Sequence, residues 1–148
     1  MKRKQPQPSD PIDLAARALR HHDRSRSQID DRLARAGVED ERRAEALEAL
    51  ERVGYVNDAR FAEGRATSLA DRGFGDEAIR ELLVADGVPP EAVDDAVAGL
   101  APEAERAAEI VASLGASART AARLARKGFG EEAVEAAAGG FAAEGPEA

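Results

Sequence analysis

A threefold internal repeat constrains the fold of this chain more than any other feature of its sequence. Gly37, Gly87 and Gly128 are separated by 50 and 41 residues. The same offsets relate four columns of mainly apolar residues: Leu19, Leu69 and Ile110; Leu33, Leu83 and Leu124; Leu47, Val97 and Ala138; and Leu50, Leu100 and Phe141. A period of about 40–50 residues is typical of arrays of small units that bury surface against their neighbours. The repeat therefore predicts three equivalent modules.

Helix signals divide each repeat into three short helices. The composition is rich in alanine, leucine, glutamate and arginine, which lose little on entering a helix, and only 3% of residues are aromatic. Asp10 before Pro11 predicts a helix start, and this helix is expected to reach about Asp23. Ser25 to Gln28 matches a capping box, and Gly37 suits a left-handed helix end. We predict an all-α fold, a tandem array of three three-helix modules with about nine short helices, elongated and curved.

The same signals predict where the modules begin and end. Residues 1–9 contain two prolines and no apolar periodicity, so we expect a disordered basic arm there. Three-helix modules are expected at residues 10–54, 55–100 and 101–142, and a loose tail at residues 143–148. A module of this size has too small a core to be very stable alone, so the modules are expected to stack.

Several classes of protein are excluded by what the sequence lacks. The chain has no cysteine, which removes disulfides, thiolate metal sites and a cysteine nucleophile. The sequence contains no run of about 18 apolar residues, so it predicts no membrane span. The first residues have no apolar segment typical of a secretory signal. The two histidines, His21 and His22, suit a solvated helix end. We therefore expect a cytoplasmic protein that is not an enzyme and binds no metal or cofactor.

One motif imitates a nucleotide-binding loop. Residues 73–78 have the spacing G-x-G-x-x-A, but the preceding residues have no strand character and Asp76 and Glu77 would repel a pyrophosphate. We interpret it as a link between two helices.

The arginines are placed unevenly along the chain. The net charge is −8, unlike that of a typical DNA-binding protein. Basic residues outnumber acidic ones in residues 1–43, and acidic residues outnumber basic ones in residues 44–100. Arg32 and Arg35 of the first repeat align with Arg123 and Arg126 of the third, whereas the middle repeat has apolar residues, Leu82 and Ala85. Two interpretations stay open. The middle module packs against its neighbours through this face while the outer two present theirs outward, or the arginines form an ordinary solvated face.

The segment from Leu50 to Ala62 contains the only tyrosine of the chain. Gly54 ends one helix and Asn57 caps the next, so Tyr55 and Phe61 are expected to pack in an elbow between modules. Asp58 and Arg60 are candidates for contact with a partner.

The chain resembles the RecX family, the regulators of the RecA recombinase. The most specific match is Leu50 to Ala62, and weaker matches lie around residues 15–19, 24–29, 33–38, 72–75, 79–82, 87–88 and 126–129. These stretches add Arg24, Arg26, Arg72 and Lys127 to the candidate partner-binding residues. They also contain the structural motif residues Gly37, Gly54, Tyr55, Phe61, Gly73, Gly87 and Gly128.

The resemblance implies an inhibitor of RecA. Such a protein would bind the groove of the RecA–single-stranded DNA filament and lower ATP hydrolysis, strand exchange and co-protease activity, by blocking filament extension or destabilising the filament. We expect a monomer with RecA as partner, with direct DNA contact through basic patches weak because the middle is acidic. The alternative is a helix-turn-helix DNA-binding transcription regulator.

Overall fold

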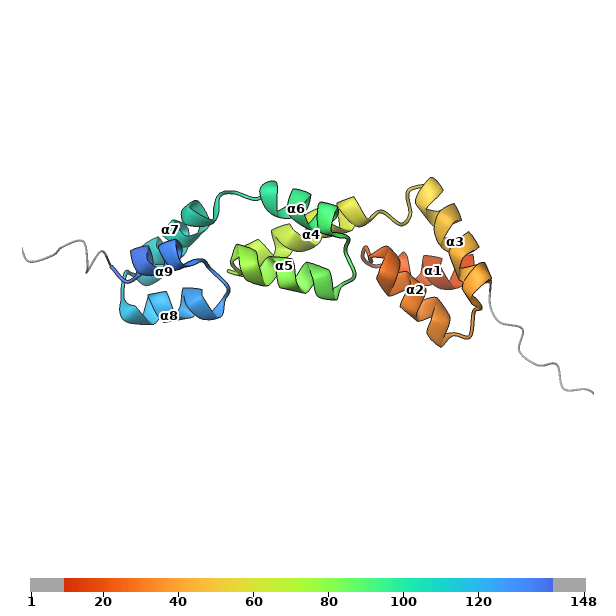
Figure 1. The fold of residues 1–148 in the computed structure, drawn as a ribbon, viewed down its shortest axis with the longest axis horizontal. Helices are drawn as coiled ribbons and strands as arrows, with labels where there is room; N and C mark the ends of the chain where they lie inside the picture. Colours follow the sequence, from red (N-terminus) through yellow and green to blue (C-terminus); the bar gives the residue numbers. More distant parts are fainter. Residues whose placement is uncertain (1–9, 140–148) are drawn as a thin grey trace, which may run out of the picture.

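The computed structural model describes residues 10–139, and within this range the chain forms nine α-helices and no strand. The fold is all-α, and the helices form an elongated, curved row of three groups of three (Figure 1). The first group, module 1, contains α1 (Pro11–Leu19), α2 (Arg26–Arg35) and α3 (Asp40–Arg52). Module 2 contains α4 (Asp58–Asp71), α5 (Asp76–Ala85) and α6 (Pro90–Ala98), and module 3 contains α7 (Glu103–Leu114), α8 (Ala118–Arg126) and α9 (Glu131–Ala137). The predicted arm at residues 1–9, residues 140–142 and the tail at residues 143–148 lie outside the described range.

Each module encloses its own hydrophobic core. Leu33, Leu83 and Leu124 occupy the same place in the three cores and have no exposed surface, at 0% each. This equivalence confirms the repeat that the sequence predicts. Other columns vary, because Leu69 is buried whereas Leu19 and Ile110 are half-buried. In module 3 four of the six buried core residues are alanines, so this module buries the least bulky side chains.

Local capping sets most helix ends, as predicted. Asp10 accepts a hydrogen bond from the Ile12 backbone N–H at 3.0 Å, and Ser25 forms the complete capping box with Gln28. The glycines that follow the second helices, Gly37, Gly87 and Gly128, have φ angles of +85°, +83° and +87°. A glycine suits these turns because a side chain disfavours positive φ.

The first helix is shorter than predicted, since α1 ends at Leu19 rather than near Asp23. The residues beyond it are held by other partners. The Arg24 side chain donates through Nε to the Ala18 carbonyl at 2.9 Å, and Asp23 is paired with Arg60 of module 2. A tertiary contact therefore ends this helix where the sequence pattern would continue it.

The second helices of the three modules follow one another along one edge of the row, with α8, α5 and α2 on the lower side of Figure 1. The N-termini of α2 and α5 each meet the C-terminal turn of the second helix in the next module. The Gly75 backbone N–H donates to the Lys127 carbonyl at 2.8 Å, and Ser25 Oγ donates to the Asp86 carbonyl at 2.5 Å. The modules are thus joined mainly at helix ends, which leaves the sides of these helices open.

Candidate partner-binding surface and the joints between modules

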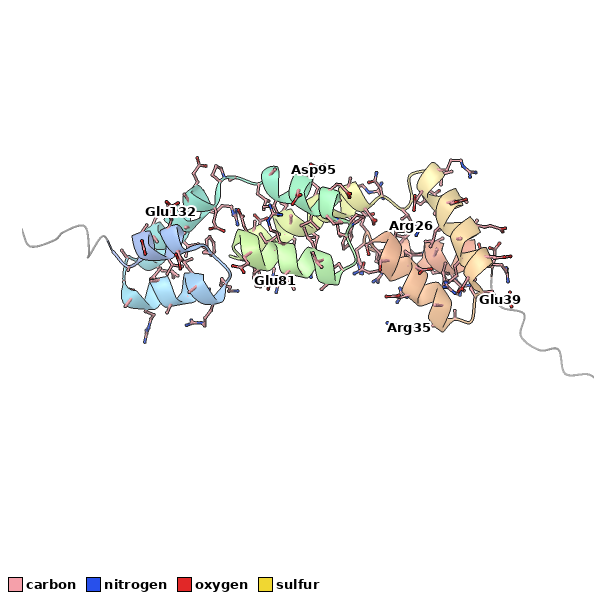
Figure 2. All side chains as sticks on the ribbon, in the orientation of Figure 1. Arg26, Arg35, Glu39, Glu81, Asp95 and Glu132 are labelled. Atoms are coloured by element: carbon pink, nitrogen blue, oxygen red, sulfur yellow. The ribbon has the colours of Figure 1, made fainter. Side chains whose placement is uncertain are left out.

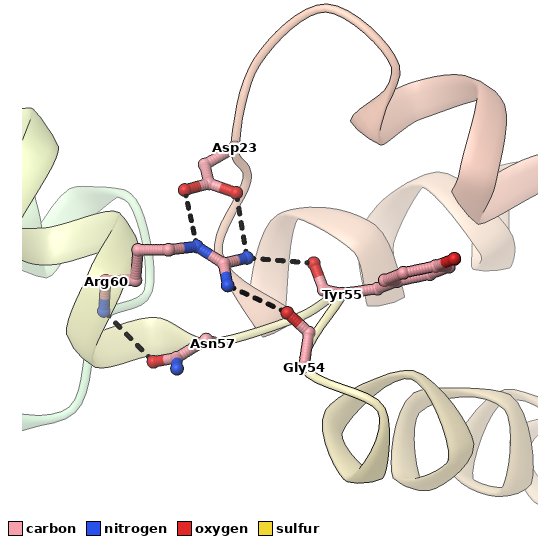
Figure 3. Close-up of polar contacts among 5 residues, drawn as sticks. All are labelled: Asp23, Gly54, Tyr55, Asn57 and Arg60. Carbon is pink, nitrogen blue, oxygen red and sulfur yellow. Dashed lines mark hydrogen bonds and ion pairs between the residues drawn. The ribbon is translucent and has the colours of Figure 1, made fainter.

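Arg60 connects modules 1 and 2 (Figure 3). Its guanidinium binds both carboxylate oxygens of Asp23, at 2.9 and 3.0 Å, and donates to the carbonyls of Gly54 and Tyr55, at 2.8 and 3.2 Å. The Asp23 carboxylate raises the pKa of Arg60 above its ordinary value. The sequence suggested Arg60 as a partner contact, whereas the structure gives its donors an intramolecular role.

Arg26 and Asp58 meet in the same joint. The backbone N–H of Arg26, at the start of α2, donates to Asp58 Oδ1 at 2.7 Å, while the Arg26 side chain pairs with Glu51 of its own module. Asp58, which is half-buried, thus satisfies a free backbone N–H at the start of a helix in the neighbouring module. Both of these candidate residues thus contribute to the joint between modules 1 and 2.

Tyr55 does not pack in the elbow, and this part of the sequence prediction is wrong. Its side chain is 60% exposed, whereas Val56 is 2% and Phe61 is 7% exposed. The backbone N–H groups of Tyr55 and Val56 both donate to the Leu50 carbonyl, at 2.9 and 3.2 Å. This helix-end turn directs Val56 into the core and leaves the Tyr55 side chain exposed. In Figure 3 the Tyr55 ring extends away from Arg60. Phe61 packs as predicted.

The joint between modules 2 and 3 uses backbone groups and a nearly buried arginine. Besides the Gly75 contact, the Glu77 backbone N–H donates to the Gly128 carbonyl at 3.3 Å. Arg106, with 11% of its side chain exposed, pairs with Asp76 at 2.7 Å and donates to the Phe74 carbonyl at 3.0 Å. The motif at residues 73–78 is thus a helix-to-helix link, as predicted. Its residues 74–77 make the contacts of this joint.

Two further candidate residues, Arg72 and Lys127, lie over the half-buried ring of Phe74. The Arg72 guanidinium carbon is 5.5 Å and Lys127 Nζ is 4.1 Å from the ring centroid. Such cation–π contacts contribute modestly at exposed sites and fix the orientation of the charge. These two cations flank the same joint, one from each module.

Of the remaining arginine candidates, Arg24 is half-buried and the other four are open to solvent. Arg32 and Arg35 on α2, and Arg123 and Arg126 on α8, are exposed and form no ion pair with any residue between 10 and 139. They lie on the second helices at the two ends of the row.

The middle module contributes no such arginine side chain, but it does not pack through this face either. Leu82 is half-buried against the core of its own module, and Ala85 is exposed. The hypothesis that this face of α5 contacts the neighbouring modules is therefore wrong, because the joints form at the ends of α5.

Acidic side chains lie on both edges, but two helices of the opposite edge have no basic residue to balance them. In Figure 2, Arg35 lies on the lower edge, and Asp95 of α6 and Glu132 of α9 lie along the upper side. Neither α6 nor α9 contains a lysine or an arginine. The row therefore has one edge with arginines at both ends and, on its other side, two third helices, α6 and α9, that carry only acidic charges.

The comparisons with known proteins identify the family. No family model matches the chain. The regulatory protein RecX of Halorhodospira halophila is 34% identical over 136 residues, covering 85% of this chain and 84% of that protein. RecX of Herminiimonas arsenicoxydans is 31% identical and covers 85% and 91%, and RecX of Chromohalobacter salexigens is 41% identical over 102 residues and covers 69% and 67%. The chain belongs to the RecX family.

Solved structures have the same fold as this RecX-family chain. A crystal structure of RecX from Lactobacillus salivarius superposes with a TM-score of 0.74 at 18% identity, covering 87% of this chain and 92% of that one. A second RecX crystal structure gives a TM-score of 0.68 at 21% identity, covering 85% and 70%. The three-module array is therefore shared with these two RecX structures.

The relatives of this RecX-family chain are named as regulatory proteins. Between residues 10 and 139 no three histidine, cysteine, aspartate or glutamate side chains gather where they could hold a metal ion. None of the helices described is both long and apolar enough to span a membrane.

Sequence reasoning missed the residues that hold module 3 in place. Glu103 accepts from the backbone N–H groups of Asp76, at 2.7 Å, and of Gly130, at 2.8 Å. An acidic residue at a helix start is explained as well by the helix dipole, so its bond to another module has no signature of its own. The repeat offset supplies one signal, because Arg26 and Asp76 are equivalent and both donate to an acid of the next module.

Proposed function

We propose that this RecX-family protein inhibits the RecA recombinase by lying along the groove of the RecA–single-stranded DNA filament. It would lower ATP hydrolysis, strand exchange and co-protease activity, by blocking filament extension or by destabilising the filament. The observation that carries the proposal is the long edge formed by α2, α5 and α8, which has at both ends exposed arginines with no ion pair to any described residue. A polymer of repeated subunits offers equivalent sites along its length, and a row of modules can contact several of them.

The chemistry of this edge favours a protein partner over bare DNA. Arginine binds carboxylates in a planar, two-bonded geometry, so Arg32, Arg35, Arg123 and Arg126 suit acidic groups on a protein surface. The net charge of −8 and the acidic third helices oppose strong binding to a phosphate backbone. Direct DNA contact is thus proposed to be weak.

Two separated clusters on one row strengthen each other. Once the pair on α2 is bound, the pair on α8 is held near its own site at a high effective concentration. Inhibition is then expected to require both clusters and to be much weaker when either is lost. The joints between modules matter for function because they set the distance between the clusters.

A titration of RecA ATPase activity tests the proposal. Purified RecA on single-stranded DNA is mixed with increasing amounts of the full chain as a monomer, whose state is checked by light scattering. We expect ATP hydrolysis to fall at amounts well below that of RecA. Unchanged hydrolysis at an excess of the protein would contradict the proposed function.

Charge reversal tests the arginine edge. The variant R32E/R35E/R123E/R126E is expected to lose inhibition by at least tenfold while its circular dichroism and melting temperature stay near those of the wild type. The matched control is R42E/R52E, which reverses two exposed arginines of α3 away from this edge. Equal potency of the fourfold variant and the wild type would remove the edge from the interaction.

The alternative of a DNA-binding transcription regulator is not favoured. A helix-turn-helix protein inserts a helix into the major groove and uses basic residues around it. Here α6 and α9 contain no basic residue, and α5 exposes Glu77 and Glu81. The decisive measurement is binding to duplex DNA over a range of salt, where we expect no sequence-dependent complex.

A further inference from the structure

A cavity lies in the joint between modules 1 and 2, and none of the four edge arginines lines it. Its volume is about 350 Å³, and it is lined by the loop before α2, the start of α2, one side of α4 and the end of α5. The side chains around it are mainly polar: His22, Asp23, Arg24, Gln28, Arg65 and Asp86. Phe61 and Gly64 of α4 complete the lining.

Gly64 is the unusual residue of this cavity. It lies in the interior of α4, where glycine is less favourable than alanine. A Cβ atom built on Gly64 would meet nothing within 4 Å, so no packing within the described residues requires a glycine. At the same register of the repeat, modules 1 and 3 have Leu14 and Glu105. The fold does not need this glycine, and its effect is to keep one wall of the cavity open.

The charges around the cavity leave one cation without an acid. Both oxygens of Asp23 bind Arg60. Asp86 binds Arg65 at 3.1 Å and also accepts from Gln28 at 3.4 Å. Every acid of the lining is therefore already paired with a donor.

Arg24 is the cation that remains. It donates through Nε to the Ala18 carbonyl at 2.9 Å and through Nη2 to Nε2 of His22 at 3.0 Å. It forms no ion pair within residues 10–139, and its Nη1 donates to no group there. The two neutral partners hold the guanidinium in place and leave its Nη1 side open.

We propose that this cavity receives an acidic side chain of a partner protein, whose carboxylate binds Arg24 while its backbone passes over α4 at Gly64. A guanidinium held by neutral partners binds a carboxylate through parallel hydrogen bonds. The volume is at the lower end of the range for ligand sites, which suits a side chain better than a nucleotide. Asp23 and Asp86 on the wall disfavour the dense negative charge of a nucleic acid. We take this partner protein to be RecA, and this identification alone rests on the proposed function.

A titration of the chain alone tests the cavity. The ¹⁵N-labelled full chain is titrated to millimolar concentrations of a hexaglutamate peptide, with hexaglutamine as the uncharged reference and a thymidine hexanucleotide as the phosphate reference. We expect saturable shifts of the Gly64 amide and Arg24 Nε signals with hexaglutamate only. Absence of saturation, or a stronger response to the oligonucleotide, would overturn the proposal.

Three variants locate the binding. R24Q removes the cation, and G64L fills the open wall with the residue found at this register in module 1. Both are expected to lose the peptide response at least fivefold, and G64L should melt at the same or a higher temperature because leucine favours a helix. The matched control R20Q removes a nearby exposed arginine outside the cavity and should respond as the wild type. An unchanged response of R24Q would refute the proposal.

The RecA ATPase titration separates this inference from the proposed function. If the wild type inhibits and G64L inhibits equally well, the cavity does not contact the filament, and the partner assignment is refuted while the proposed function stands. If G64L needs at least fivefold more protein for half inhibition, the cavity is part of the RecA contact. If the wild type does not inhibit, the proposed function is refuted and the peptide titration alone decides the cavity.

Discussion

The two joints of the molecule share two contacts between helix ends and differ in the side chains around them. In both, the first backbone N–H of a second helix donates to an acid of the next module, from Arg26 to Asp58 and from Asp76 to Glu103, at 2.7 Å each. Around this contact the joint between modules 1 and 2 relies on exposed side chains, since Arg60 and Asp23 are 45% and 41% exposed. The difference indicates that the joint between modules 1 and 2 depends more on salt-sensitive pairs than the joint between modules 2 and 3 does.

The joint between modules 2 and 3 brings backbones together instead. A Cβ atom added to Gly75 would lie 2.5 Å from the carbonyl of Gly128. A Cβ atom added to Gly128 would lie 2.5 Å from the Cβ atom of Ala78. Arg106 is largely buried beside them and its guanidinium carbon is 5.8 Å from the Phe129 ring centroid. Module 3, whose core is mostly alanine, is thus joined through closely approaching backbones and a largely buried arginine, and we infer that this joint supplies stability that its core lacks.

The largest expected effect separates steric contact from backbone strain. G128A and G37A place a side chain at nearly the same positive φ, +87° and +85°, but only Gly128 touches another module. We expect G128A to lose about 1–3 kcal/mol more free energy of unfolding than G37A, because the backbones must separate. Urea denaturation of both variants measures this difference. Equal losses would mean that the second joint is not tightly packed.

Next in size is the removal of one arginine from each joint. R106M is expected to cost about 2 kcal/mol, because it leaves partly buried acceptors without a charged donor. R60M is expected to cost about 1 kcal/mol or less, because solvent replaces the donors at an exposed pair. Thermal and urea unfolding give the comparison. A larger loss for R60M than for R106M would reverse the proposed ranking of the joints.

Salt should change the geometry of one joint more than that of the other. The chain has no cysteine, so spin labels can be placed at the exposed positions Glu45, Glu91 and Glu135 through cysteine substitutions. In about 1 M NaCl the screening length falls to about 3 Å. We expect the distance distribution from module 1 to module 2 to broaden and that from module 2 to module 3 to stay the same. Equal broadening would contradict the distinction.

The smallest effect is expected at the elbow between modules 1 and 2. Y55A removes an exposed side chain and should change stability by less than about 0.5 kcal/mol. V56A, one residue later, removes buried volume and should cost about 1 kcal/mol or more. Urea denaturation of both variants tests which side chain supports the joint. A large loss for Y55A would show that the tyrosine packs in solution.

The fold could be predicted well because its signals are local or periodic. Ser25 and Gln28 satisfy each other's backbone groups within four residues, and Gly37, Gly87 and Gly128 end helices through their own dihedral angles. The offsets of 50 and 41 residues then relate these local units to one another. The candidate partner residues were less accessible to prediction. Arg26, Asp58 and Arg60 are charged residues of the kind that suggests a binding surface, yet they hold two modules together.

The amino-acid sequence alone determined the helices, their ends and the threefold repeat, because caps, glycine turns and apolar periodicity act over a few residues. The tertiary structure alone decided which charges are free. Asp23 and Arg60 are 37 residues apart and Asp76 and Arg106 are 30 apart, so no local pattern pairs them. The isolation of Arg24 beside Gly64 likewise arises only when two modules meet, since the charge available to a partner is what remains after the internal pairs have formed.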